Sequence, residues 1–322
     1  GMYKTTDAGQ SWQFLGLEDA GQIGAVEVHP EDPDRVYAAA LGSPFGSNPQ
    51  RGVFRSTDGG ASWEKVLFAS DSTGAIDIEI HPTNPDILYA SMWRGERKPW
   101  TIISGARGED GIYKSTDGGD TWRKIENGLP ALIGKIDFAV TPAAPDRVYA
   151  LVEAKAPDEG LYRSDDRGET WALVNNEEGG LMTRPFYFTN VDAHPTNPDE
   201  VYVGNVRYYV SKDGGETFDR KSTPHADNHD LWINPENPAI RIQANDGGVN
   251  VSLDGGETWS TQHNQPTAEL YQVNIDSQFP YWLYAGQQDN TTIAVPSLPP
   301  AESAPAGPEG WWNALGGCET GP

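Results

Sequence analysis

One eight-residue pattern occurs six times in the chain and restricts the fold more than any other feature of the sequence. Each copy has Ser or Thr first, Asp third, Gly fifth, Ser or Thr seventh and an aromatic residue eighth; the copies occupy residues 5–12, 56–63, 115–122, 164–171, 211–218 and 252–259. Successive third-position aspartates lie 51, 59, 49, 47 and 41 residues apart. A strand-containing repeat of this length is typical of a β-propeller.

Each copy of this pattern, called the box below, has the composition of a tight hairpin. Short alternating segments flank Asp58-Gly59-Gly60 in the second copy. Asp accepts hydrogen bonds from nearby backbone N–H groups, and Gly adopts a positive φ without steric cost. The closing Trp63 offers a large apolar face, so it is expected to fill the space between neighbouring sheets.

A second repeat alternates with the box. An alternating strand, a turn bracketed by prolines and another apolar strand occur at residues 26–38, 76–90, 136–150, 191–203 and, in degraded form, 231–244. Together with the box hairpin, this repeat gives four strands per unit. The sequence therefore predicts an all-β chain in which residues 1–322 form a single β-propeller of four-stranded antiparallel blades.

The blade boundaries follow from the two repeats. A half-blade is expected at 1–16, and blades at about 22–68, 74–128, 133–176, 186–221, 229–263 and 270–315. The last blade lacks a box, and its outer strand is expected at 311–314. Six blades and a half are close to a ring of about seven, and an incomplete or open ring is the alternative.

Charge and cysteine content exclude several classes of protein. The net charge is −24, whereas nucleic-acid binding needs clustered Lys and Arg. Cys318 is the single cysteine, which excludes an internal disulfide. No apolar run approaches the length of a membrane-spanning helix, so membrane insertion is not expected. Because the chain opens in the third strand of a blade without a signal peptide, it is expected to be a piece of a longer protein.

Two long loops follow the second strands of early blades and are candidates for ligand binding. One covers residues 41–50, and the other begins at Trp93 and Arg94 and includes Trp100. Tryptophan beside arginine suits a sugar or peptide surface. The alternative is that the loop is fixed by packing on the next blade, and the sequence leaves both open.

Polar residues gather at the ends of the later inner strands, where a propeller's strands converge on its axis. His225, Asp227 and His229 share one face if their segment is extended, so they are candidate ligands for a divalent cation. The alternative is that they form turns or hydrogen bonds. Further candidate ligand-binding residues are Arg184, Tyr187, His229, Gln287 and Gln288.

Carboxylates in the same region suggest a glycoside hydrolase, which needs two of them close together. The candidates are Asp230 and Asp246 of the blade at 229–263 and Asp289 of the blade at 270–315. The alternative for each is a structural role at the end of a strand or turn. The sequence does not give their separation, and it leaves enzymatic activity open.

The box resembles the Asp-box, or BNR, repeat, because all six copies fit Ser/Thr-x-Asp-x-Gly-x-Ser/Thr-Trp/Phe. The combined pattern looks most like secreted bacterial proteins described as sortilin-like or BNR-repeat glycosyl hydrolases. It is more distantly similar to family 74 xyloglucanases and photosystem II assembly factors. Segments 227–235, 245–248 and 287–290 are similar to segments of the first group. The resemblance implies an extracellular or periplasmic location and box aspartates without a catalytic role.

Two functions are compatible with these observations. The first is a propeller that binds, and in its fuller form hydrolyses, a carbohydrate at the mouth of its central channel. The second is a non-catalytic scaffold that binds a protein or peptide, as in the receptor and assembly-factor relatives.

Overall fold

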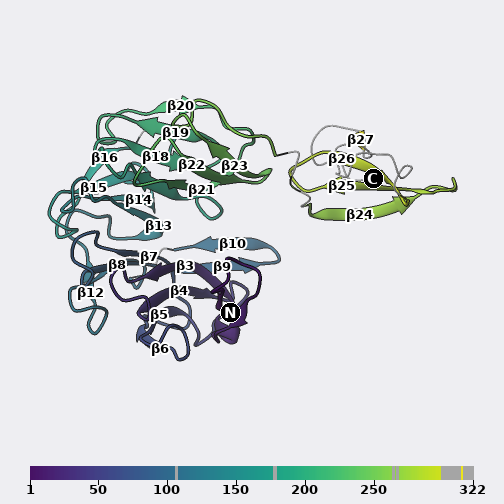
Figure 1. The fold of residues 1–322 in the computed structure, drawn as a ribbon. Coiled ribbons are helices and arrows are strands. Elements are labelled where there is room, and N and C mark those ends of the chain that lie inside the picture. Colours follow the sequence, from purple (N-terminus) through teal and green to yellow (C-terminus); the bar gives the residue numbers. More distant parts are fainter. Residues whose placement is uncertain (106–107, 177–179, 263–264, 266–267, 299–312, 315–322) are drawn as a thin grey trace. The chain divides into compact units, whose positions relative to one another are not determined.

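The computed structural model describes the chain except residues 106–107, 177–179, 263–264, 266–267, 299–312 and 315–322 (Figure 1). Contacts divide the chain into two compact units, Gly1–Lys221 and Ser222–Pro322, called unit 1 and unit 2. The prediction of an all-β propeller chain is confirmed, because the described residues form antiparallel strands and a single short 3-10 helix, η1 (Glu18–Ala20). Within the same residues, no helix has the length and apolarity needed to cross a bilayer.

Unit 1 contains four sheets of four antiparallel strands each, in the spatial order inner, second, third, outer. The first two sheets are β3 (Gln22–Val28), β4 (Val36–Gly42), β5 (Gly52–Ser56), β6 (Glu64–Leu67), and β7 (Gly74–Ile80), β8 (Leu88–Trp93), β11 (Gly111–Ser115), β12 (Arg123–Ile125). The next two are β13 (Ile133–Val140), β14 (Val148–Ala154), β15 (Gly160–Ser164), β16 (Ala172–Asn175), and β17 (Asn190–Ala193), β18 (Val201–Gly204), β19 (Tyr208–Ser211), β20 (Asp219–Lys221).

Two shorter pairs complete unit 1. The predicted half-blade is a two-stranded sheet of β1 (Tyr3–Lys4) and β2 (Gln13–Phe14). The long loop after β8 folds into a hairpin of β9 (Gly95–Lys98) and β10 (Thr101–Ser104). The backbone N–H of Arg97 donates to the carbonyl of Pro44 at 2.7 Å, so this hairpin contacts the other long loop of the unit.

Every box forms the hairpin turn that the sequence predicts, with the same hydrogen bonds in each copy. In the second copy, the Ser56 hydroxyl donates to Asp58 Oδ1 at 2.8 Å and accepts from the N–H of Gly60 at 2.8 Å. The hydroxyl of Ser62 donates to Asp58 Oδ2 at 2.6 Å, and its N–H donates to Oδ1 at 2.8 Å. These bonds hold the pKa of the box aspartate at about 2. The box is therefore a structural turn stabilised by an ionised carboxylate.

The apolar core of unit 1 lies between neighbouring sheets. Tyr37, Val53 and Leu67 of the first sheet pack with Ile78 and Met92 of the second. Trp171 of the fourth box is 5% exposed and belongs to a cluster that joins the second and third sheets. The closing tryptophan therefore fills the space between sheets at this box, as predicted.

Cations also connect each box of unit 1 to the next one. The residue directly before a box donates to the carbonyl of the residue that follows the aspartate of the next box. The four pairs are Lys4 to Gly59, Arg55 to Gly118, Lys114 to Arg167 and Arg163 to Gly214, at 3.3, 2.8, 2.6 and 3.4 Å. The series stops at the next box, which Val210 precedes.

Unit 2 contains two sheets. The first has three strands, β21 (Asn228–Ile233), β22 (Arg241–Asn245) and β23 (Gly248–Ser252). The second has four, β24 (Leu270–Ile275), β25 (Trp282–Gln287), β26 (Thr292–Pro296) and β27 (Asn313–Ala314). The expected outer strand at 311–314 is described only over Asn313–Ala314. That all sheets of both units belong to one ring stays a prediction.

The first sheet of unit 2 lacks the expected fourth strand among the described residues, and the edge of β23 bonds instead to side chains and to the backbone N–H of Ser260. The Val249 N–H donates to Gln265 Oε1 at 2.8 Å, and the Val251 N–H donates to Ser260 Oγ at 2.9 Å. These contacts satisfy edge groups that a neighbouring strand would otherwise bond.

Candidate functional site

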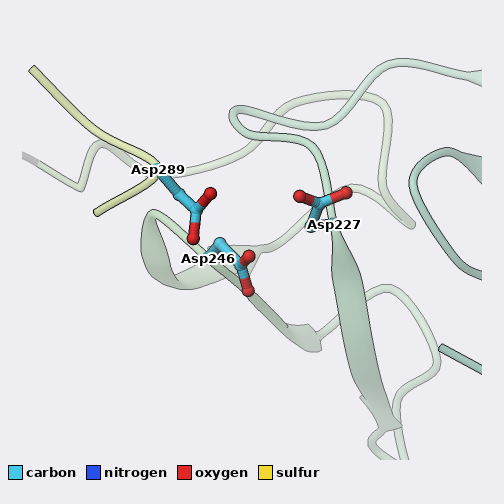
Figure 2. A group of neighbouring side chains, drawn as sticks. All are labelled: Asp227, Asp246 and Asp289. Carbon is cyan, nitrogen blue, oxygen red and sulfur yellow. The ribbon is translucent and has the colours of Figure 1, made fainter. Parts of the chain in front are cut away.

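Three aspartates of unit 2 bring their carboxylates together (Figure 2). Asp227 precedes β21, Asp246 lies in the turn between β22 and β23, and Asp289 lies in the turn between β25 and β26. One oxygen from each lies within 4.8 Å of the other two, and all three residues are partly exposed. Among the described residues this is the one group of three carboxylate, His or Cys side chains with such a spacing.

Backbone contacts hold the three turns in place. The Asp246 N–H donates to the carbonyl of Asp227 at 3.2 Å, and the Asn290 side-chain amide donates to the carbonyl of Asp246 at 3.2 Å. Asp227 and Asp289 have φ values of 60° and 55°. Asp adopts this left-handed conformation more readily than most residues, which places each carboxylate at a sharp change of chain direction.

His229 joins the carboxylate cluster through Asp246. Its Nε2 lies 2.6 Å from Asp246 Oδ1, with 42% of the His229 side chain and 24% of the Asp246 side chain exposed. The contact orients one Asp246 oxygen and leaves the second for another partner. The sequence placed both residues in the candidate site, and the structure brings them into contact.

A network of buried amides lies beneath the turn that carries Asp246. The Gln243 amide donates to Asn228 Oδ1 at 2.6 Å, and the Asn245 amide donates to Gln243 Oε1 at 2.7 Å and Asn250 Oδ1 at 2.9 Å. Asn245 Oδ1 accepts from the N–H of Gly247 at 3.0 Å. Satisfied networks of this kind rigidify the structure around them, so the amides fix the turn.

Sequence reasoning did not identify Gln243 and Asn250 as part of the site's support. The signal was a reversed alternation in β22 and β23, where the polar residues are buried and the apolar residues are exposed. Asn250 is fully buried, whereas Val249 and Val251 are 46% and 39% exposed. Buried amides at alternate strand positions indicate a polar interior behind the turn.

The predicted metal ligands are distributed differently from the expectation. The ring nitrogens of His225 face the carbonyls of Ala226 and Asp289, at 3.0 and 2.9 Å, and His229 contacts Asp246. Asp227 is the member of the predicted set that joins the carboxylate cluster. Three carboxylate oxygens are hard ligands of the kind that Ca²⁺ and Mg²⁺ prefer, with Ca–O distances of about 2.3–2.6 Å. A divalent cation at this place stays a prediction.

The remaining predicted residues of unit 2 lie beside the carboxylate cluster. Asp230 is exposed on β21, opposite Ala244, and is not in the group of three. The Gln287 side chain donates to the carbonyl of Thr291 at 3.1 Å and closes its own turn. The Gln288 N–H donates to the carbonyl of Glu269 at 2.9 Å.

In unit 1, the predicted aromatic residues form one cluster. Trp93 is 3% exposed, its ring lies 5.2 Å from that of Phe186, and its Nε1 donates to Ser104 at 3.0 Å. Phe186 contacts Tyr187, which is 43% exposed. Trp93 therefore supports the cluster from within, and Tyr187 presents its ring to solvent. Trp100 is 81% exposed and lies apart from these contacts in the β9–β10 turn.

The two predicted arginines have structural contacts. The Arg94 guanidinium pairs with Glu96 at 2.7 Å, and the Arg94 N–H donates to Asp110 at 2.8 Å, which supports the packing alternative for this loop. Arg184 is exposed, and its carbonyl accepts from the N–H of Tyr187 at 2.9 Å. Its side chain is therefore placed at the surface beside the aromatic cluster, and its ligand-binding role stays a prediction.

The repeated box hairpins and the antiparallel sheets packed face to face define an Asp-box repeat β-propeller protein. Residues 1–160 match the Sortilin-Vps10 family model, described as sortilin, neurotensin receptor 3. Curated relatives include a xyloglucanase of Paenibacillus sp, 29% identical over 139 residues, and a xyloglucanase of Hypocrea jecorina, 32% identical over 142 residues. The matches cover 39% of this chain and only 12% and 15% of the two relatives.

Solved structures agree with the fold. YCF48 from Cyanidioschyzon merolae has a TM-score of 0.50 at 14% identity, with 88% of this chain and 84% of that chain covered. YCF48 bound to D1 peptide has a TM-score of 0.51 at 17% identity, with 89% and 83% covered. At such identities the likeness establishes the propeller architecture alone.

Proposed function

We propose that this chain is a carbohydrate-binding propeller, acting outside the cytoplasm, whose ligand binds at the Asp227, Asp246 and Asp289 cluster of unit 2. The observation that carries the proposal is the convergence of these carboxylates from three separate turns. Carboxylates are strong acceptors for sugar hydroxyls, because charged hydrogen bonds are about twice as strong as neutral ones. The sequence relation to xyloglucanases supports a β-linked glucan such as xyloglucan as the substrate class.

The spacing also supports hydrolysis as the fuller form of this function. Retaining glycosidases use two carboxyl groups about 5–5.5 Å apart, and inverting enzymes need about 6.5–9.5 Å. One oxygen of Asp246 and one of Asp289 lie within 4.8 Å of each other, so the two carboxylates are close enough to act as a pair. Asp246 and Asp289 are the proposed pair, and Asp227 holds the turn that carries Asp246 through the bond between its carbonyl and the Asp246 N–H.

Binding is tested with xyloglucan in affinity gel electrophoresis, and turnover is tested by release of reducing ends. Asp246→Asn should weaken binding by about 10-fold or more, because a charged hydrogen bond contributes roughly 1.5–3 kcal/mol. Glu236→Gln, in an exposed turn of the same unit, is the control and should bind as the parent does. Thermal unfolding of both variants checks that any loss is not a loss of folding.

The peptide-binding alternative gives a different result in the same assays. A chain that retains no glucan, and whose Asp246→Asn variant loses affinity for a basic peptide instead, would be a non-catalytic scaffold. Glucan binding that is unchanged in Asp246→Asn would place the sugar elsewhere and contradict the proposed site.

A further inference from the structure

A second set of carboxylates lies in unit 1, on the inner strands of its four complete sheets, and the proposed function does not use it. Three of its members, Glu27, Glu79 and Asp192, each lie two residues before the histidine of the turn that ends their strand. The other two, Asp77 and Asp137, occupy the position of the repeat that lies two residues before that of Glu79. Because side chains alternate along a strand, all five positions point in the same direction relative to their strands. This inner-strand cluster is Glu27 on β3, Asp77 and Glu79 on β7, Asp137 on β13 and Asp192 on β17.

Two of these carboxylates connect adjacent inner strands. Asp77 Oδ2 accepts from the N–H of Phe138 at 3.0 Å, and Asp137 Oδ2 accepts from the N–H of Val191 at 2.7 Å. Phe138 and Val191 occupy equivalent places in successive sheets. Each bond satisfies a backbone N–H on the edge of an inner strand that faces away from the second strand of its sheet, so these carboxylates cannot move away without breaking contacts between sheets.

A basic side chain also acts on this group of carboxylates. This side chain is Lys135, two residues before Asp137, and it also interacts with Glu153 of β14. Burial lowers the pKa of Lys135, which shows how unfavourable a charge is at this place. The described carboxylates of unit 1 also contain no group of three close enough to share a metal ion. Protonation of these carboxyl groups removes their charge and so relieves the repulsion.

The pKa values of the cluster follow this electrostatic environment. Burial, with repulsion from Asp77, raises the pKa of Glu27 to about 7. Burial raises the pKa of Glu79 well above its usual range, and Asp77, Glu27, Asp137 and Asp192 add to the increase. Burial followed by the charge of Asp77 raises the pKa of Asp137 in the same way, although its hydrogen bond from Val191 opposes the shift.

We propose that the inner-strand cluster makes unit 1 sensitive to protons, so that its four sheets are held together more firmly in mildly acidic solution than in mildly alkaline solution. The folded chain binds more protons than the unfolded chain when carboxyl pKa values are raised by folding. The free energy of unfolding therefore falls as pH rises from the ordinary carboxyl range through about 7. This is the opposite of the usual behaviour of carboxylates that are paired with cations.

Thermal unfolding of the whole chain between pH 5 and pH 8 tests the proposal. The measurements are made in 0.5 M NaCl, where repulsion among surface charges is screened within a few ångströms, on the order of 4 Å, but the partly buried inner-strand cluster is screened less. The melting temperature should be several degrees higher at pH 5 than at pH 8. Glu79→Gln and Asp137→Asn should each raise the melting temperature at pH 8 and reduce the difference between the two pH values. Glu31→Gln, in an exposed turn of unit 1, should leave the difference unchanged.

A direct titration keeps the proposal testable if one variant fails to fold. In carbon-13 NMR of the parent protein, carboxyl signals that disappear in Glu79→Gln or Glu27→Gln should titrate above pH 6. Titration of those signals below pH 5, or melting curves of Glu79→Gln and Asp137→Asn that shift with pH as much as the parent's, would overturn the proposal.

Discussion

At the scale of single residues, the buried hydroxyl of the box contributes more to the stability of the turn than the nearby aspartate does. Ser56 is 1% exposed, and its oxygen accepts from the N–H of Gly60, a buried residue. The Asp58 carboxylate also accepts from Ser56, but its two bonds from Ser62 lie at the surface. Water can replace the bonds of Asp58 more easily than those of Ser56.

Ser56→Ala should therefore lower the free energy of unfolding by about 1–3 kcal/mol, the cost of leaving a buried donor without an acceptor. Thr5→Ala makes the same change in the first box, where the corresponding bond, from Gly9, is exposed. That variant should lose less, under about 1 kcal/mol. Urea unfolding followed by circular dichroism measures both, and equal losses in the two variants would contradict the assignment.

The residue scale also shows why the box was predictable and the site was only partly so. The hydrogen bonds that the box aspartate forms with the two hydroxyl residues join positions at most four apart, so the pattern itself contains the geometry of the turn. The predicted set of His225, Asp227 and His229 assumed an extended segment, but the positive φ of Asp227 ends the alternation there and turns its carboxylate toward Asp246 and Asp289. No local sequence pattern indicates that turns so far apart in the chain bring their side chains together.

At the scale of elements, the closing aromatic of the box has different surroundings in different copies. Trp171 is 5% exposed and packs between two sheets, whereas Trp12, in the turn between β1 and β2, is 61% exposed. The expectation that these tryptophans fill the space between sheets therefore holds where complete sheets lie on both sides. The same reasoning explains Trp93, which ends the fully buried strand β8 and so cannot present an open ring.

Trp171→Ala should cost about 3–5 kcal/mol of unfolding free energy, as is usual for a buried tryptophan. Trp12→Ala, at the same position of another box, should change stability by no more than about 0.5 kcal/mol. Urea unfolding followed by circular dichroism is suited to the comparison, because it does not depend on the tryptophans that are removed. Similar losses of stability in both variants would contradict the prediction that Trp12 contributes little because its side chain is exposed.

At the scale of the whole molecule, two families of carboxylates have opposite responses to pH. The box aspartates have pKa values of about 2, because hydrogen bonds stabilise their ionised form. Their contribution to stability is complete above the ordinary carboxyl pKa and is lost as pH falls toward 2. The inner-strand cluster instead favours folding when protonated, and its contribution declines as pH rises toward 7.

Stability should therefore pass through a maximum near pH 5 and decline on both sides. Urea midpoints measured from pH 2.5 to pH 8 at constant ionic strength give the profile. Asp137→Asn should flatten the alkaline side and leave the acidic side in place, because the boxes are unaltered. A parent profile that rises steadily to pH 8 would contradict the opposition between the two groups.

The cations that precede the boxes of unit 1 have a consequence for how such chains grow. Lys4, Arg55, Lys114 and Arg163 each reach the carbonyl just after the aspartate of the following box. Donor and acceptor thus occupy fixed positions in the repeat. A copy added by gene duplication therefore contains both the cation that bonds to the next box and the carbonyl that accepts from the preceding one. A lineage can therefore lengthen or shorten the array without first redesigning the modules on either side.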